Sequence, residues 1–158
     1  MKNILLTAML LTPTLLAGQQ NSINNERKKQ VELRLQLANS LFNENRNDEA
    51  LNLYLDFVEL YPESPLRITA LANSAVIYER KQRFMLAVAQ YQKLQNALGN
   101  SARGLAYYFE QGRLYEKVGL DDKARVVYER IIAANANGPL ARKARGRLAL
   151  LNLLPLGN

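Results

Sequence analysis

The sequence predicts an all-α fold made of repeated helix hairpins, and two observations support this prediction. Apolar residues recur three and four positions apart in successive segments, which is the helical period, and no segment shows sustained strand alternation. The alanines Ala50, Ala87 and Ala124 are 37 residues apart, which indicates that one structural unit repeats. Cysteine is absent from the 158 residues, so helix packing must hold the fold without disulfides.

The clearest unit spans residues 68–99 and predicts two helices separated by the polar stretch 79–83. The small residues Ala75 and Ala87 leave room for two helices to approach closely, while neighbouring tyrosines fill the space beside them. One such hairpin cannot bury both of its faces, so neighbours of the same kind are expected. The pattern recurs upstream of this unit at Leu37, Ala38 and Leu41. It recurs downstream of the unit at Tyr108, Gly112 and Tyr115.

Capping signals mark the start of individual helices. Asp48 places negative charge in a first turn, where the helix dipole favours it. Ser64 precedes Pro65, which is a good cap followed by a residue suited to the first helical position, and Gly138 precedes Pro139 in a similar way. The predicted helices cover residues 24–45, 48–61, 65–81, 84–97, 102–118, 121–135 and 139–154.

The order of small residue, tyrosine, alanine, aromatic residue and closing proline over residues 31–154 resembles the tetratricopeptide repeat. The departures are Arg34 at the position typical of tryptophan, and Gly99 and Ala136 where proline would close the second and third repeats. The resemblance implies a right-handed α-solenoid of about three helix hairpins with a C-terminal capping helix. The long interval and the linker 61–65 look most like the tetratricopeptide domains of bacterial envelope proteins, such as the periplasmic cell-division coordinator and the outer-membrane-barrel assembly lipoprotein.

The N-terminus is predicted to be a secretory signal peptide. Lys2 precedes an apolar run from Ile4 to Leu16, which ends at small residues and is too short for a comfortable membrane span. An uncleaved anchor is the alternative. Gln19 stands where a lipoprotein would have its lipidated cysteine, so we expect a periplasmic or secreted protein that is not a lipoprotein. The expected organisation is a signal peptide at 1–18, a polar lead at 19–30 and a tetratricopeptide-repeat domain at 31–158.

Neither catalysis nor metal binding is expected from the residue types present. Histidine is absent as well as cysteine, which removes the usual general base near neutral pH and the commonest metal ligand. The acid pairs at 48–49 and 121–122 begin helices, where capping and the helix dipole explain them. No glycine-rich phosphate loop is present, so we expect no cofactor, and the repeat resemblance implies a non-enzymatic protein.

The resemblance implies a concave groove lined by the first helix of each repeat. Leu35, Phe42, Val76 and Phe109 would present apolar groups to this groove, which favours an apolar anchor from a protein or peptide partner. The alternative is that some of them pack against the N-terminal helix. The predicted groove residues are Leu35, Asn39, Phe42, Ala72, Asn73, Val76, Phe109 and Arg113.

One specificity known in this repeat family is not expected here. Asn39 and Asn73 match the asparagines of tetratricopeptide domains that grip the carboxylate of a chaperone tail. Leu35, Ala106 and Glu110 stand where such domains have basic residues, so the charge that would hold the carboxylate is missing.

Charge and terminal leucines suggest further contacts. The chain has a net charge of +7, and Arg142, Lys143, Arg145 and Arg147 form a predicted basic patch in the last helix. Such a patch favours an anionic envelope polymer or membrane surface as the alternative partner, whereas nucleic acid is not expected without a reader motif. The C-terminal leucines exceed what one neighbouring helix can cover, so self-association is predicted there unless the tail folds back onto the last hairpin.

Overall fold

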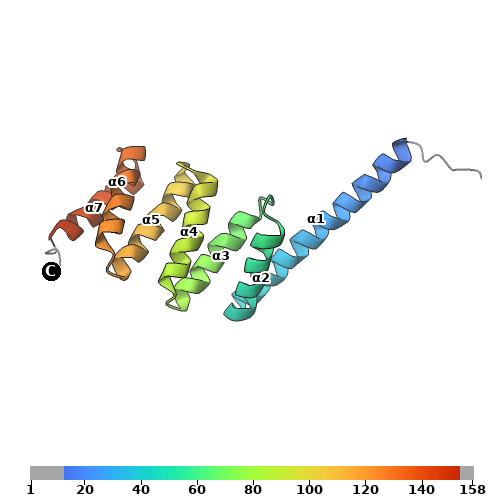
Figure 1. The fold of residues 1–158 in the computed structure, drawn as a ribbon, viewed down its shortest axis with the longest axis horizontal. Helices are drawn as coiled ribbons and strands as arrows, with labels where there is room; N and C mark the ends of the chain where they lie inside the picture. The colour runs from blue at the N-terminus through green and yellow to red at the C-terminus, as the bar shows by residue number, and fades with distance from the viewer. Residues whose placement is uncertain (1–12, 154–158) are drawn as a thin grey trace, which may run out of the picture.

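The computed structural model describes residues 13–153, which contain seven α-helices and no strand (Figure 1). The helices are α1 (Pro13–Asn43), α2 (Asn47–Leu60), α3 (Arg67–Arg80), α4 (Phe84–Leu98), α5 (Ala102–Lys117), α6 (Asp121–Ala134) and α7 (Pro139–Leu153). The predicted all-α fold is confirmed, and all helix ends except the beginning of α1 lie within a few residues of their predicted positions.

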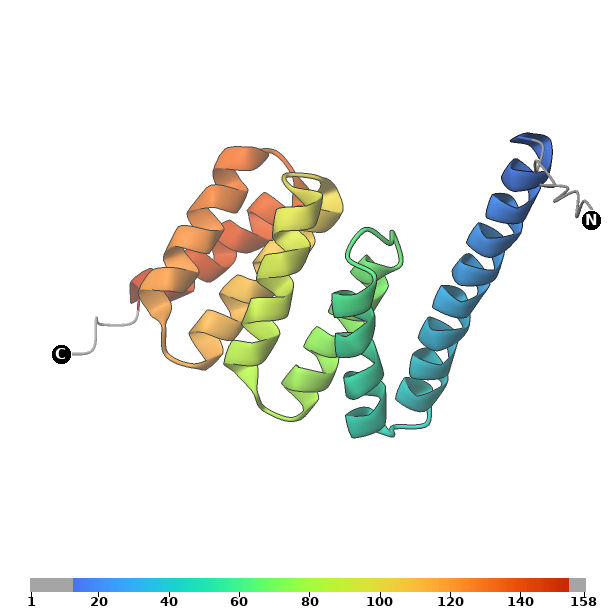
Figure 2. The same cartoon turned by 45° about the vertical axis from the view of Figure 1, so that its right-hand side comes forward.

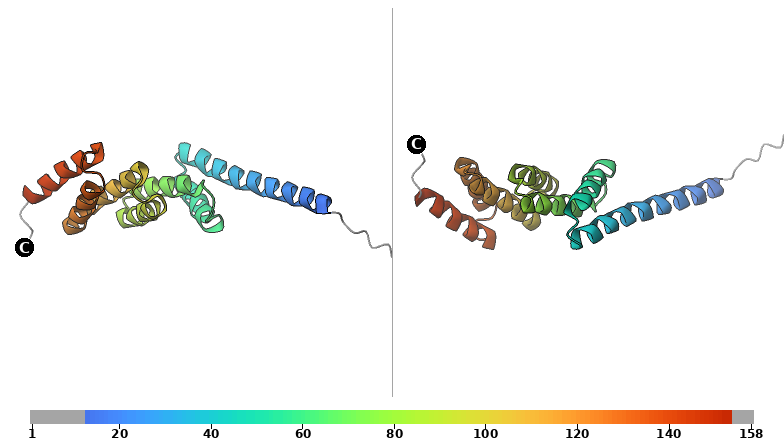
Figure 3. Two further views of the ribbon diagram at one scale, coloured as in Figure 1. Left: turned by 90° about the horizontal axis from the view of Figure 1, so that it is seen from above. Right: turned by 90° about the horizontal axis from the view of Figure 1, so that it is seen from below.

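Successive helices pack against one another, and α7 contacts α5 as well as α6. The first six helices form three hairpins in a row, which α7 closes (Figure 1). Seen from above, α1, α3, α5 and α7 lie along the inner side of a curve, whereas α2, α4 and α6 lie along the outer side (Figure 3). The predicted solenoid of three hairpins and a capping helix is therefore confirmed.

The closest contacts between helices fall at small residues, as the repeat pattern predicts. Ala50, Ala87 and Ala124 are all 0% exposed. A Cβ atom on Gly112 would lie 2.9 Å from the Tyr128 ring, so only glycine lets α5 and α6 approach this closely. Large side chains fill the space between the hairpins, and Tyr54 is fully buried in the core.

The beginning of α1 differs from the prediction. The helix starts at Pro13, not near residue 24, and residues 19–30 are exposed and polar but helical (Figure 2). Gly18 is the one strong helix-destabilising residue after Pro13, and a single glycine costs only about 1 kcal/mol, so the helix continues through it. Residues 1–12 of the predicted signal peptide lie outside the described residues. No helix among those described is long and apolar enough to cross a membrane.

The two ends of the array expose different kinds of side chain. Leu37 is 54% exposed, whereas Ser74 and Gln111 at the same repeat position are 0% and 3% exposed. Leu37 follows the repeat pattern but is exposed, because none of the helices within residues 13–153 covers this face of α1. At the other end, Arg145 and Asn152 occupy positions that are tyrosine in the preceding repeat, and they are exposed, as a polar cap requires.

The C-terminal leucines are only partly covered. Leu151 is buried, while Leu150 and Leu153 are exposed. Leu154 and Leu156 lie outside the described residues. Self-association through this end stays a prediction.

Candidate partner-binding groove

The inner helices α1, α3 and α5 carry all eight of the predicted groove residues, but these residues have different surroundings. Leu35 is 5% exposed and belongs to the core, so its predicted place in the groove is wrong. Ala72 and Phe109 share its repeat position and also pack against the core, because this position faces the neighbouring hairpin. The other five, Asn39, Phe42, Asn73, Val76 and Arg113, are half-buried, and the Phe42 ring also packs against the core.

Three polar links join each inner helix to the next. The first link connects α1 to α3. The Tyr54 hydroxyl donates to Asn39 Oδ1 at 2.7 Å, and the Asn73 amide donates to the Tyr54 hydroxyl at 2.8 Å and to Asn39 Oδ1 at 3.2 Å. Two of the predicted groove residues thus meet each other and a buried tyrosine of the outer helix α2.

The second link connects α3 to α5 and carries charge. The Tyr91 hydroxyl donates to Glu79 Oε1 at 2.7 Å, while Arg113 Nη2 lies 2.5 Å from Glu79 Oε2. Arg113 Nε also donates to Glu110 at 2.7 Å. The guanidinium of this predicted groove residue is therefore held between two carboxylates, so it helps to fix the spacing of α3 and α5.

The third link connects α5 to α7 by the same arrangement. The Tyr128 hydroxyl donates to Glu116, and Arg147 Nε donates to Glu116 Oε1 at 3.0 Å. Arg147 forms a two-bonded ion pair with this carboxylate. Arg147 is therefore not a free member of the predicted basic patch.

The sequence analysis missed Glu79 and Glu116, which are the acceptors of the two charged links. The signal was present, because these glutamates are 37 residues apart and each precedes the tyrosine that it binds by 12 residues. In the first repeat Phe42 takes the place of the glutamate, and the link uses asparagines instead.

The charged links perturb the tyrosines. Burial raises the pKa of Tyr91 and of Tyr128 above the ordinary value near 10, and the bond to a glutamate raises it further. The folded state therefore holds these two protons more tightly than the unfolded chain does. The stability that they contribute is complete below about pH 10 and falls as the pH rises above it.

A double variant with Tyr91→Phe and Tyr128→Phe should lose stability less steeply than the native protein between about pH 9.5 and 11.5. Urea unfolding at several pH values measures this slope, with the two proteins compared first at pH 7 as a control. Equal slopes would show that the two hydroxyls do not titrate differently on unfolding.

Cations of the inner helices lie against aromatic rings of other helices. The Phe42 ring packs edge-on to Tyr54 with centroids 6.3 Å apart, and the Arg80 guanidinium lies 4.4 Å from the Phe42 centroid. Lys117, which occupies the repeat position of Arg80, lies 4.4 Å from the Phe84 ring. Val76 is half-buried and belongs to neither core cluster, so it is an apolar side chain of α3 that the fold leaves available.

The predicted basic patch is reduced to three residues. Arg142 donates to the carbonyl of Asn137 at 3.2 Å, and Arg145 donates to that of Ala136 at 2.5 Å. Lys143 is exposed, and none of these three forms an ion pair within residues 13–153. The same part of the chain contains no cluster of acidic side chains that could hold a metal ion.

Comparison with known proteins defines the class of this fold. Residues 32–64 match the family model of the tetratricopeptide repeat. The Arabidopsis OM64 tetratricopeptide domain is similar in structure, with a TM-score of 0.57 and 17% identity over 76% of this chain and 94% of that domain. The predicted tetratricopeptide repeats are thus confirmed in the sequence of the first unit and in the fold of the array.

Two further structures have the same fold. The first tetratricopeptide domain of Spaghetti (RPAP3), bound to the HSP90 peptide SRMEEVD, has a TM-score of 0.56 and 20% identity over 78% of this chain and 91% of that one. A Podosopora anserina protein with nearly identical TPR-like repeats has a TM-score of 0.55 and 19% identity over 77% of this chain. The present chain spans 65% of the length of that protein. No curated protein matches the sequence.

Proposed function

We propose that this protein is an exported, non-enzymatic scaffold of a bacterial cell envelope that captures an extended or helical segment of a partner protein along α1, α3 and α5. The observation that carries the proposal is Val76, a half-buried apolar side chain of the inner helix α3 that belongs to neither core cluster. Apolar side chains left in a concave surface favour an apolar anchor from the partner. The tetratricopeptide neighbour bound to an HSP90 peptide supports this class of partner.

The mechanism follows from the links between the inner helices. Val76 occupies the same repeat position as Asn39 and Arg113, so one apolar side chain lies between two polar ones that are already bonded. Because the links fix the inner helices at a set spacing before binding, little ordering of the groove itself is required when the partner arrives. A partner segment would place an apolar side chain against Val76 and polar groups on either side.

Val76→Glu should weaken partner binding by roughly 1–3 kcal/mol, the scale of losing a desolvated apolar anchor. Leu86→Glu is the matched control, because Leu86 is an exposed leucine of the outer helix α4. The Leu86→Glu protein should bind the partner as tightly as the native protein does. Crosslinked capture from envelope extracts, followed by titration of the captured partner, measures both. Phe109→Ala is a poor test, because the Phe109 ring packs 5.4 Å from that of Tyr128 and its loss would disturb the core.

A second candidate function is an adaptor for an anionic envelope polymer or membrane surface. The observation that favours it is the absence of acidic partners for Arg142, Lys143 and Arg145 within the described chain. Binding of this kind would weaken steeply as salt rises, whereas apolar anchoring at Val76 would respond little. If Val76→Glu bound normally and a charge reversal at Arg142 and Lys143 failed at low salt, the adaptor function would replace the groove.

Export is part of the proposal and has its own test. The mature protein should begin close to Gly18 or Gln19, because the apolar run ends at small residues there. Of the described residues, cleavage would remove only residues 13–17 or 13–18, at the beginning of α1. The intact mass of the periplasmic form checks this expectation. A mass that retains Met1, in a protein found with membranes, would show an uncleaved anchor instead.

A further inference from the structure

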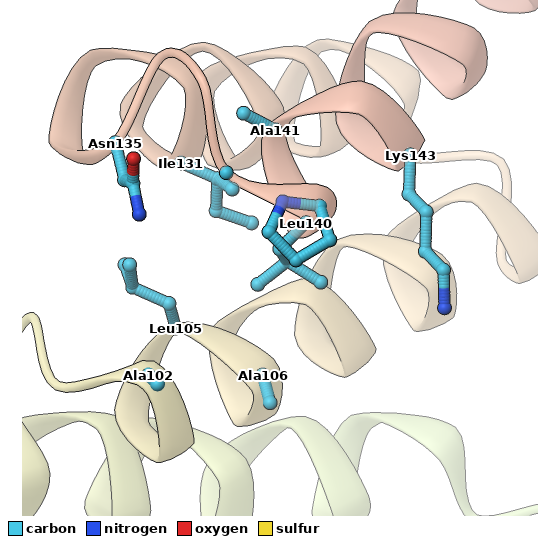
Figure 4. A pocket seen from close by; sticks show the side chains of 10 residues that line it. Ala102, Leu105, Ala106, Ile131, Asn135, Leu140, Ala141 and Lys143 are labelled. Atoms are coloured by element: carbon cyan, nitrogen blue, oxygen red, sulfur yellow. The ribbon is translucent and has the colours of Figure 1, made fainter.

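A small apolar pocket lies where α5 begins, α6 ends and α7 begins (Figure 4). Its volume is about 210 Å³. Leu105, Ile131 and Leu140 extend from the three helices toward this space, and Ala102 and Ala106 form the adjoining wall on α5 (Figure 4). An apolar cavity of about 150 Å³ holds a benzene ring, so this pocket is large enough for a leucine or phenylalanine side chain.

The charge around the pocket has one sign. Lys143 is the one charged residue that lines it, and this lysine forms no ion pair within the described chain. Arg142 and Arg145 of α7 also form no ion pair within the described chain, and Arg103 lies in the first turn of α5. A ligand of the pocket therefore gains most from an apolar group with a negative charge beside it.

The pocket lies between two of the inner helices, α5 and α7. Ala106 and Lys143 are 37 residues apart and occupy the same repeat position on the neighbouring inner helices α5 and α7. A partner segment that crosses the inner helices from α3 toward α7 would reach this pocket if it ran toward the beginning of α5. This placement favours a peptide side chain over a free small molecule as the occupant.

We propose that this pocket is a specificity site for a peptide in which a leucine or phenylalanine enters the pocket and an adjacent aspartate or glutamate pairs with Lys143. The inference rests on the proposed function, and it adds the side chains that the partner segment must carry. The apolar side chain of the peptide is selected by Leu105, Ile131 and Leu140. The negative charge of the adjacent peptide residue is selected by Lys143.

The probe is a blocked synthetic peptide, acetyl-Gly-Ser-Leu-Asp-Ser amide, titrated into the isotopically labelled protein and followed by nuclear magnetic resonance. We expect shifts of the backbone amides of Ala106, Leu140 and Lys143. Two control peptides, with serine in place of leucine or lysine in place of aspartate, should bind about tenfold more weakly. Equal binding of the three peptides, or shifts confined to other parts of the chain, would overturn the proposal.

Two variants test the roles of the lining residues. Ala106→Trp, at an exposed position, should fill the pocket and weaken the leucine–aspartate peptide about tenfold, with the helical circular dichroism unchanged. Lys143→Glu should reverse the preference, so that the leucine–lysine peptide becomes the tighter one. Unchanged affinity in Ala106→Trp, or an unchanged preference in Lys143→Glu, would contradict the assignment.

Octanoate is a further probe of the same pocket. If octanoate binds and the peptide does not, the pocket is a site for a free fatty acid and the proposal is overturned.

The pocket and the groove can fail separately. Val76→Glu should leave binding of the short peptide unchanged, because Val76 lies on α3 and does not line the pocket. If the peptide does not bind while Val76→Glu still abolishes partner capture, the pocket assignment fails and the groove stands. If the peptide binds and Val76→Glu has no effect on the partner, the groove fails.

Discussion

Replacing Ala87 with arginine should lower the free energy of unfolding by roughly 3–5 kcal/mol, because a long charged side chain would enter a contact that has no room for it. Ala87 is 0% exposed and belongs to the core between α3 and α4. The guanidinium would either remain buried without a partner or push the two helices apart. Thermal and urea unfolding measure the loss.

Lys123→Ala is the control for this variant. Lys123 is exposed, and its ammonium lies 5.7 Å from the Tyr115 ring, so its removal should cost less than about 1 kcal/mol. Both substitutions fall in the first turns of an outer helix. If the two variants had the same unfolding midpoint, the 37-residue repeat would not mark the buried face of these helices.

Tyr128→Ala should lower the free energy of unfolding by roughly 3–5 kcal/mol, the usual cost of removing a large buried side chain. The Tyr128 side chain is fully buried, and its ring fills the space against Gly112 that a Cβ atom would otherwise occupy. The substitution also removes the hydroxyl that donates to Glu116 in the link between α5 and α7. Urea unfolding gives the loss directly.

Tyr128→Phe separates the ring from the hydroxyl. It keeps the ring and removes only the hydrogen bond to the Glu116 carboxylate, so it should cost about 1.5–3 kcal/mol, the range for a hydrogen bond to a charged group. If Tyr128→Ala had the same free energy of unfolding as Tyr128→Phe, packing of this ring between α5 and α6 would not contribute to the stability of the array.

The helices could be predicted well from the sequence because the same residue pattern occurs in each of the three hairpins. Ala50, Ala87 and Ala124 mark the same close contact in three hairpins, and these contacts depend on residue size alone. The beginning of α1 was not predicted, because polar residues outside the repeats carry no pattern of burial that could mark where a helix starts. The exposure of Leu37 could not be read from the repeat pattern either, since burial at this position requires a covering helix that the described part of the chain does not supply.

The groove was predicted only in part, because burial at one repeat position depends on which neighbour it faces. Leu35, Ala72 and Phe109 were all assigned to the groove, but the repeat position that they share packs against the core. Arg147 was assigned to a free basic patch, although it pairs with Glu116 on another helix, 31 residues earlier. Side-chain pairing across helices requires the relative rotation of those helices, which the spacing of residues in one helix does not supply.

Site-specific photo-crosslinking tests the central claim, capture of a partner along the inner helices, most directly. A photoreactive amino acid replaces Val76 on the inner side in one variant, Lys93 on the outer side in a second and Lys143 on α7 in a third, each in cells with an intact envelope. We expect a discrete protein adduct from position 76 and none from position 93. A protein adduct from position 93 would contradict capture along the inner helices. So would a result in which no position gives a protein adduct and position 143 gives an adduct to polymer or lipid.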